Sequence, residues 1–116
     1  MALGDLEREV MTQLWDAGEP LTVRQVHERL SRQRDLAYTT VMTVLDRLAK
    51  KGVVLQQKAD RAYRYAAAQS REEMTASLML DALSSSDDQD AALAYFVGQL
   101  PPEALVAVIE AAQKKR

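Results

Sequence analysis

Apolar residues near the start of the chain recur at the spacing of an α-helix. Leu6, Val10 and Leu14 lie one turn apart among charged residues, which predicts an amphipathic helix over residues 5–17. Gly18 follows where helices commonly end, because glycine adopts the left-handed conformation without steric cost. The first segment is therefore predicted to be one helix that buries a single face.

Two further helical patterns follow. Thr22 and Gln25 form a capping box, which predicts that a second helix begins after Leu21. The segment 31–37 is polar and basic, and it is predicted to form a turn. A third helix is predicted over residues 39–51. Its apolar side comprises Val41, Val44, Leu45 and Leu48.

The apolar period changes to that of β-structure after the third helix. Residues 53–58 are predicted to form a strand, residues 59–60 a short turn and residues 61–65 a returning strand. Tyr63 and Tyr65 share one face of that strand, and we expect core packing for them rather than stacking on a base. The order helix, turn, helix and hairpin predicts a winged helix-turn-helix.

The remainder of the chain is predicted to be helical, over residues 70–83, 91–97 and from Pro101 and Pro102 onwards. These helices are short, and they offer little apolar area for a core of their own, so a second copy of the chain is expected to cover them. We predict a mostly α protein with a small β-hairpin wing. It has a DNA-binding domain at residues 1–68 and a helical dimerisation domain at residues 69–116. The predicted dimer contacts are Leu78, Leu93, Phe96, Leu105 and Ile109.

Charge is distributed unevenly along the chain. The formal net charge is −2. Residues 24–71 nevertheless hold eleven Lys and Arg against four Asp and Glu, a net of +7. Residues 72–116 hold three against eight, a net of −5. Because phosphate attraction depends on the local field, the basic half is predicted to face DNA.

Candidate DNA contacts lie on the polar side of the third helix and on the hairpin. Short Thr side chains can contact phosphates, base edges or thymine methyl groups, and Arg can form two hydrogen bonds to guanine. Lys near a helix end or on a wing suits phosphates. An ordinary exposed helix surface is the alternative for the same residues. The candidates are Thr39, Thr40, Thr43, Arg47, Lys50, Lys51, Lys58 and Arg61.

Several classes of function are disfavoured by composition. The chain has no Cys and one His, His27, which excludes disulfides, thiolate chemistry and a multi-His metal site. It has no Gly-rich phosphate loop and no catalytic constellation, so we expect no enzyme, no cofactor and no metal. No segment resembles a signal peptide or reaches membrane-spanning length, so we expect a cytoplasmic protein without membrane insertion.

The motifs together resemble the penicillinase-repressor family. They are LGDLEREVM at residues 3–11, LTVRQV at 21–26, AYTTVMTVLDRL at 37–48 and Arg61-x-Tyr-x-Tyr65. The resemblance implies a homodimeric repressor that binds dyad-symmetric operators near β-lactamase or related resistance genes. It also implies Thr39, Thr40, Thr43 and Arg47 as recognition-helix contacts, with Arg61 in the wing. It further implies relief of repression when a membrane sensor-protease pathway leads to cleavage in the C-terminal half.

Two departures from the family pattern matter. The cleavage site familiar in some members has Asn before Phe, whereas this chain has Tyr95 before Phe96, so cleavage there is a hypothesis beside a structural role in the dimer. The copper-responsive branch has C-terminal Cys residues, which this chain lacks.

Two alternative functions stay open. One is a winged-helix regulator that binds a small effector, and the other is a winged-helix protein-interaction module that does not bind DNA.

Overall fold

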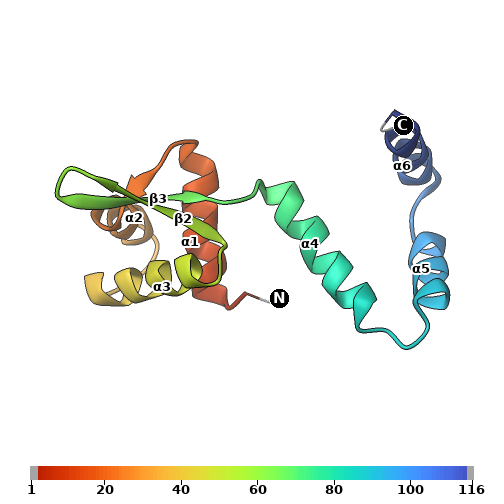
Figure 1. The fold of residues 1–116 in the computed structure, drawn as a ribbon, viewed down its shortest axis with the longest axis horizontal. Coiled ribbons are helices and arrows are strands. Elements are labelled where there is room, and N and C mark those ends of the chain that lie inside the picture. The colour runs from red at the N-terminus through yellow and green to blue at the C-terminus, as the bar shows by residue number, and fades with distance from the viewer. Residues whose placement is uncertain (1–2, 115–116) are drawn as a thin grey trace. The chain divides into compact units, whose positions relative to one another are not determined.

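The computed structural model describes residues 3–114 and divides the chain into two compact units. The first unit ends at Ser77 and the second begins at Leu78. The elements of the first unit are α1 (Asp5–Ala17), β1 (Leu21–Thr22), α2 (Val23–Leu30), α3 (Tyr38–Lys50), β2 (Val54–Ala59) and β3 (Ala62–Ala67). All three helices expected in this half of the chain are present (Figure 1).

The core of the first unit is built from the apolar faces of its three helices and the base of its sheet. Each helix contributes residues at the predicted spacing, because positions three or four apart share one helix face. The completely or almost completely buried side chains include Val10, Met11, Val26, Leu30, Val41, Leu45 and Leu48. Val54 and Tyr65 close the core from the sheet. The helix-turn-helix and its hairpin are thus held by one core.

The helix ends follow the local signals in the sequence. The Thr22 hydroxyl accepts a hydrogen bond from the Gln25 N–H at 3.2 Å, and the Gln25 side chain accepts one from the Thr22 N–H at 2.8 Å. This reciprocal pair is the predicted capping box at the start of α2. Gly18 has φ 68° and ends α1, which confirms its expected place in the left-handed region.

The sheet has three strands in the order β1-β3-β2, with both pairs antiparallel. β1 was not expected, because two residues are too few to show the alternation of apolar and polar side chains that marks a strand. The prediction of a turn at residues 59–60 was wrong by one residue, since Ala59 still pairs with Ala62. The turn consists of Asp60 and Arg61, and Asp60 has the positive φ of 56° that a tight hairpin requires.

The tyrosines of β3 have different surroundings. Tyr65 is buried, and its hydroxyl accepts a hydrogen bond from the Gln56 side chain at 2.9 Å. Tyr63 is exposed, so the prediction that both pack in the core was wrong for Tyr63. The hairpin extends past the end of the helical layer, and Tyr63 lies near its tip opposite Lys58 (Figure 1).

The start of α4 (Arg71–Ser84) belongs to the first unit. Met74 is buried there, and the Arg71 guanidinium pairs with the Asp16 carboxylate of α1 at 3.0 Å. The sequence suggests a boundary after residue 68, where the sheet ends. These contacts bring the first turns of α4 into the first compact unit, so the division at residues 77–78 falls within a helix.

The second unit contains the rest of α4, α5 (Gln89–Gly98) and α6 (Pro102–Lys114). The Asp88 carboxylate caps α5 by accepting from the Ala91 N–H at 3.0 Å. No residue of α5, nor of α6 as far as the described Lys114, is buried. Across residues 3–114, the structure holds no helix with the length and apolar character that a membrane crossing needs.

Candidate nucleic-acid interface

The outward face of α3 brings together most of the predicted DNA contacts. Its inward face is buried through Val41, Val44, Leu45 and Leu48, which fixes the rotation of the helix about its axis. Five candidates are consequently exposed along the other side of the helix. They are Thr39, Thr40, Thr43, Arg47 and Lys50.

The Thr43 hydroxyl can accept a hydrogen bond from a ligand but cannot donate one. The Thr43 hydroxyl donates to the Thr39 carbonyl oxygen at 2.9 Å. Its only hydrogen is therefore used within the helix, and the oxygen can only accept from a ligand. Thr43 then suits a base amino group or a methyl contact better than a phosphate, which offers acceptors alone.

The two lysines at the end of α3 are placed differently. Lys50 is exposed and forms an (i, i+4) ion pair with Asp46 at 3.2 Å, which is weak in water and easily exchanged for a phosphate. Lys51 instead reaches the Glu7 carboxylate of α1 at 2.9 Å. The Glu7 side chain is only 16% exposed. Lys51 thus links α1 to the end of α3 in the structure.

Glu7 has a depressed pKa. The Gly4 backbone N–H donates to its carboxylate at 2.9 Å and is the largest cause, and the Lys51 ammonium is the next. Both favour the ionised carboxylate, so the pKa lies below its ordinary value of 4.5. A depressed folded-state pKa stabilises the protein above the unfolded-state pKa, and this contribution is lost as pH falls through the folded-state value.

We expect Glu7→Gln to destabilise the protein at neutral pH but not in acid. The variant should lose at most about 1 kcal/mol of unfolding free energy at pH 7, because the Lys51 side chain is 38% exposed and water screens the pair from that side. The difference from wild type should disappear at a pH well below 4.5. Urea denaturation at pH 7 and at the acidic pH measures the difference in unfolding free energy between the variant and wild type. Glu28→Gln, on the exposed face of α2, is the control. An equal difference at both pH values would contradict a role for the Glu7 charge.

The wing candidates lie at and near the tip of the hairpin. Arg61 occupies the turn, and Lys58 faces Tyr63 across the strands. Arg64 pairs with Gln57, the residue before Lys58. Because successive residues of a strand face opposite sides, the Lys58 and Arg64 side chains project from opposite faces of the hairpin. The tip of the hairpin and the first residues of α3 point toward the same side of the unit (Figure 1).

Contacts near the turn between α2 and α3 were not predicted. Arg34 pairs with Glu9 of α1 at 2.7 Å. His27 is half-buried, its Nε2 atom lies 2.7 Å from the Leu36 carbonyl oxygen, and its ring meets Tyr38 edge-on at 5.8 Å. No sequence pattern signals these pairs, because their partners lie on other elements or beyond the turn.

The chain matches the family model described as penicillinase repressor over residues 3–113. This match includes the helix-turn-helix, the hairpin and the C-terminal helices. The chain belongs to the penicillinase repressor family. It is accordingly a winged-helix transcriptional repressor and not an enzyme.

The repressor is similar to the transcriptional regulator BlaI in two strains of Mycobacterium tuberculosis, CDC 1551 / Oshkosh and ATCC 25618 / H37Rv. Each is 62% identical over 98 residues, which are 82% of this chain and 71% of the relative. The solution structure of the DNA binding domain of the repressor BlaI covers 61% of this chain and 85% of that one, with a TM-score of 0.55 and 28% identity.

A second solved structure is Bacillus licheniformis BlaI, in monomeric form and in complex with the blaP half-operator. It covers 63% of this chain and 88% of that chain, with a TM-score of 0.54 and 27% identity. Both structures confirm the predicted winged helix-turn-helix fold of the repressor.

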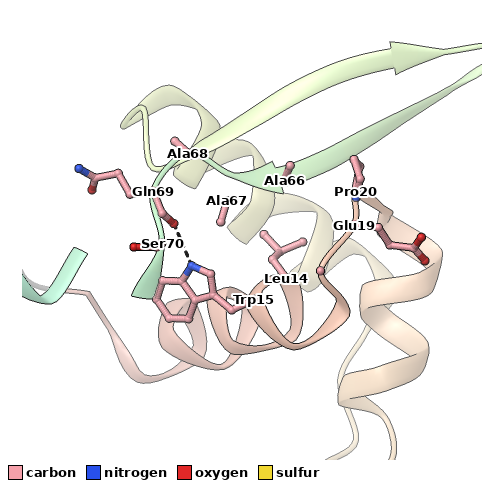
Figure 2. Close-up of a pocket in the computed structure, with 10 residues that line it drawn as sticks. Leu14, Trp15, Glu19, Pro20, Ala66, Ala67, Ala68, Gln69 and Ser70 are labelled. Carbon is pink, nitrogen blue, oxygen red and sulfur yellow. Dashed lines mark hydrogen bonds between the residues drawn. The ribbon is translucent and has the colours of Figure 1, made fainter. Parts of the chain in front are cut away.

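A groove lies on the first unit of the repressor, beside Trp15 (Figure 2). Its volume is about 340 Å³, and it is open to solvent. The Trp15 Nε1–H donates to the Gln69 carbonyl oxygen at 3.0 Å, and the Arg71 guanidinium lies 5.2 Å from the indole ring. Other parts of the lining are Leu14, Gly18, Pro20 and the segment 66–68. The groove has the size of a small organic molecule.

Proposed function

We propose that this repressor binds double-stranded, dyad-symmetric operator DNA as a homodimer, at β-lactamase or other antibiotic-resistance genes. The observation that supports it most is the row of exposed Thr, Arg and Lys side chains on α3, beside a basic wing. In helix-turn-helix proteins the second helix enters the major groove, and two-fold symmetric dimers place two such helices about one helical turn of DNA apart or a multiple of it.

Each side chain has a role that suits its place. Arg47 is exposed in the last turn of α3 and is assigned a base or phosphate contact in the major groove. Thr39 and Thr40 contact base edges and the backbone nearby, and Thr43 contacts base edges. Lys50, Lys58 and Arg61 are assigned phosphate contacts, because they lie at the end of α3 and on the wing.

The C-terminal helices are proposed to form the dimer interface. Leu93, Phe96 and Ile109 are exposed in the single chain, and Leu78 and Leu105 are half-buried. Apolar side chains this exposed on helices without buried residues are expected to pack against a partner. A second copy of the chain can cover these side chains on both subunits through one symmetric contact.

Repression is proposed to end through a sensor-linked proteolytic pathway that cuts near Tyr95 and Phe96. Both side chains are exposed, but they lie within α5, so local opening of that helix must come before cleavage. Mass mapping after incubation with the activated sensor tests this step. An intact α5 under conditions that release the operator would contradict it.

The proposed function is tested by fluorescence anisotropy of the purified repressor on DNA from upstream of its own gene, as a salt series. An unrelated fragment of equal length is the comparison. Preference for the upstream fragment, with affinity that falls steeply with salt, supports a repressor of its own operon. No binding to either fragment at low salt would favour the protein-interaction alternative.

Replacement of Arg47 and replacement of Lys58 are expected to weaken DNA binding in different ways. Arg47→Ala should weaken operator binding by about 1–3 kcal/mol and relax the preference at one base pair per half-site. Lys58→Ala should weaken operator and unrelated DNA alike and reduce the salt slope by about one per half-site. If Arg47→Ala weakens both DNAs equally, Arg47 is a phosphate contact instead.

The groove beside Trp15 favours a second candidate, regulation by a small effector. Trp15 is the one tryptophan of the chain, so its fluorescence reports directly on occupancy of this groove. Titration with candidate effectors should change Trp15 emission and operator affinity over the same concentration range. Emission changes without any effect on operator affinity would reject the regulatory role.

A further inference from the structure

Two large apolar side chains lie exposed on the same helix as the polar DNA contacts. Tyr38 is 45% exposed and Met42 is 43% exposed. They are four residues apart on α3, so their side chains are neighbours on its surface. We call this pair the apolar strip. The other exposed large apolar side chains of the described DNA-binding unit, Leu55 and Tyr63, are on the strands.

The apolar strip borders the threonine row. At 100° per residue, Met42 lies about 60° from Thr39 around the helix axis, on the side away from Arg47. The buried face of α3 is fixed by Val41 and Leu45, so Met42 cannot turn inward without moving these residues into solvent. Met42 therefore stays exposed beside Thr39, at the edge of the face that carries the proposed DNA contacts.

One end of the strip is held in place by the preceding helix. His27 of α2 has Nε2 2.7 Å from the Leu36 carbonyl oxygen, and since a carbonyl only accepts, this nitrogen donates. The same ring packs edge-on against Tyr38 at an interplanar angle of 73°. Tyr38 is thereby positioned at the first residue of α3 before any ligand binds.

We propose that the apolar strip contacts thymine 5-methyl groups in the major groove, and that Met42 makes the operator preference of this repressor depend on them. The proposal rests on the operator binding proposed above. The major groove presents one apolar group, the 5-methyl of thymine, beside its hydrogen-bonding edges. A flexible thioether fits such a methyl without a fixed geometry.

The surroundings favour DNA over a protein as the occupant. Exposed Thr39, Thr43 and Lys50 share this part of α3, and the segment of residues 24–71 around it has a net charge of +7. Protein-binding patches usually expose roughly several hundred Å² of continuous apolar surface, which two side chains bordered by threonine and charged groups do not provide.

The test replaces each operator thymine in turn by uracil, which removes only the methyl group. Anisotropy titrations compare wild type, Met42→Ala and Met42→Gln, with Leu55→Ala as a control that removes another exposed apolar side chain, from β2. For wild type we expect one or two thymines per half-site whose replacement weakens binding about fourfold, as for one buried methyl-sized group. The Leu55→Ala repressor should show the same penalties.

In Met42→Ala and Met42→Gln the penalty at one of these thymines should disappear, while the salt slope stays that of wild type because no phosphate contact is lost. Wild-type binding that is insensitive to uracil at every position overturns the proposal. So does an unchanged penalty in both Met42 variants. Absence of binding by the wild-type repressor to either fragment at low salt would instead overturn the proposed function itself.

Discussion

An Ile109→Asp repressor is expected to bind its operator about 10²- to 10⁴-fold more weakly than wild type, because linking two binding units contributes a gain of this order. Ile109 is 55% exposed on α6, a helix without buried residues among those described. In a dimer it would be covered by the partner. An aspartate there would bring a charge into an apolar contact, and a monomer keeps the contacts of a single half-site.

Ala107→Asp is the matched control for this substitution. Ala107 is exposed on α6 and lies about 200° from Ile109 around the helix, so it adds the same charge to the opposite side. Sedimentation velocity should show a monomer for Ile109→Asp and a dimer for Ala107→Asp, and affinity for a half-operator should be the same for both. An Ile109→Asp protein that stays dimeric would remove α6 from the interface.

Leu48→Ala is expected to lower the free energy of unfolding by about 2–5 kcal/mol, the range for truncating a fully buried leucine. Leu48 has no exposed surface and lies in the last turns of α3, next to the strand that leads into the wing. Its removal leaves a cavity that the surrounding helices cannot fill without shifting. This loss is a large part of the stability of a small domain.

Leu55→Ala deletes the same atoms from a side chain that is 53% exposed. Urea denaturation monitored by circular dichroism should give this control a free energy of unfolding within about 1 kcal/mol of that of wild type, as for surface substitutions. A Leu48→Ala protein as stable as the control would mean that α3 is not fixed by the core as described. The rotation of its DNA-facing side would then be undetermined.

Much of the DNA-binding unit could be predicted from local patterns. Helix spacing placed Val41, Val44, Leu45 and Leu48 on one side of α3, and all four are buried. Once that face is known, the exposure of Arg47 and its neighbours follows from helix geometry alone. The capping residues and the glycine that ends α1 are likewise local signals, set by neighbours within a few residues.

What could not be predicted depends on partners distant in sequence. Lys51 was a candidate phosphate contact, and nothing near it shows that Glu7 lies 2.9 Å from its ammonium group. The exposure of Tyr63 depends on where the helical layer ends below the hairpin. The pairing of β1 depends on β3, more than forty residues later.

The C-terminal half is hard to predict for a different reason. Residues 91–97 of α5 are all apolar, so the helix has no polar side to show which face is covered. Leu93 and Phe96 were chosen as interface residues, yet Tyr95 and Val97 are also exposed in the single chain. The interface predictions for this half therefore remain predictions.

The opposed charges of the two halves have a consequence for the repressor's search for its operator. Residues 72–116 have a net charge of −5, so this half is repelled by the phosphates to which the basic half is attracted. Attraction to phosphates is the main source of binding to random sequence, and random sites greatly outnumber operators in a genome. The acidity of the proposed dimerisation half should therefore reduce sequestration along the chromosome, so that fewer copies of the repressor are needed to keep an operator occupied.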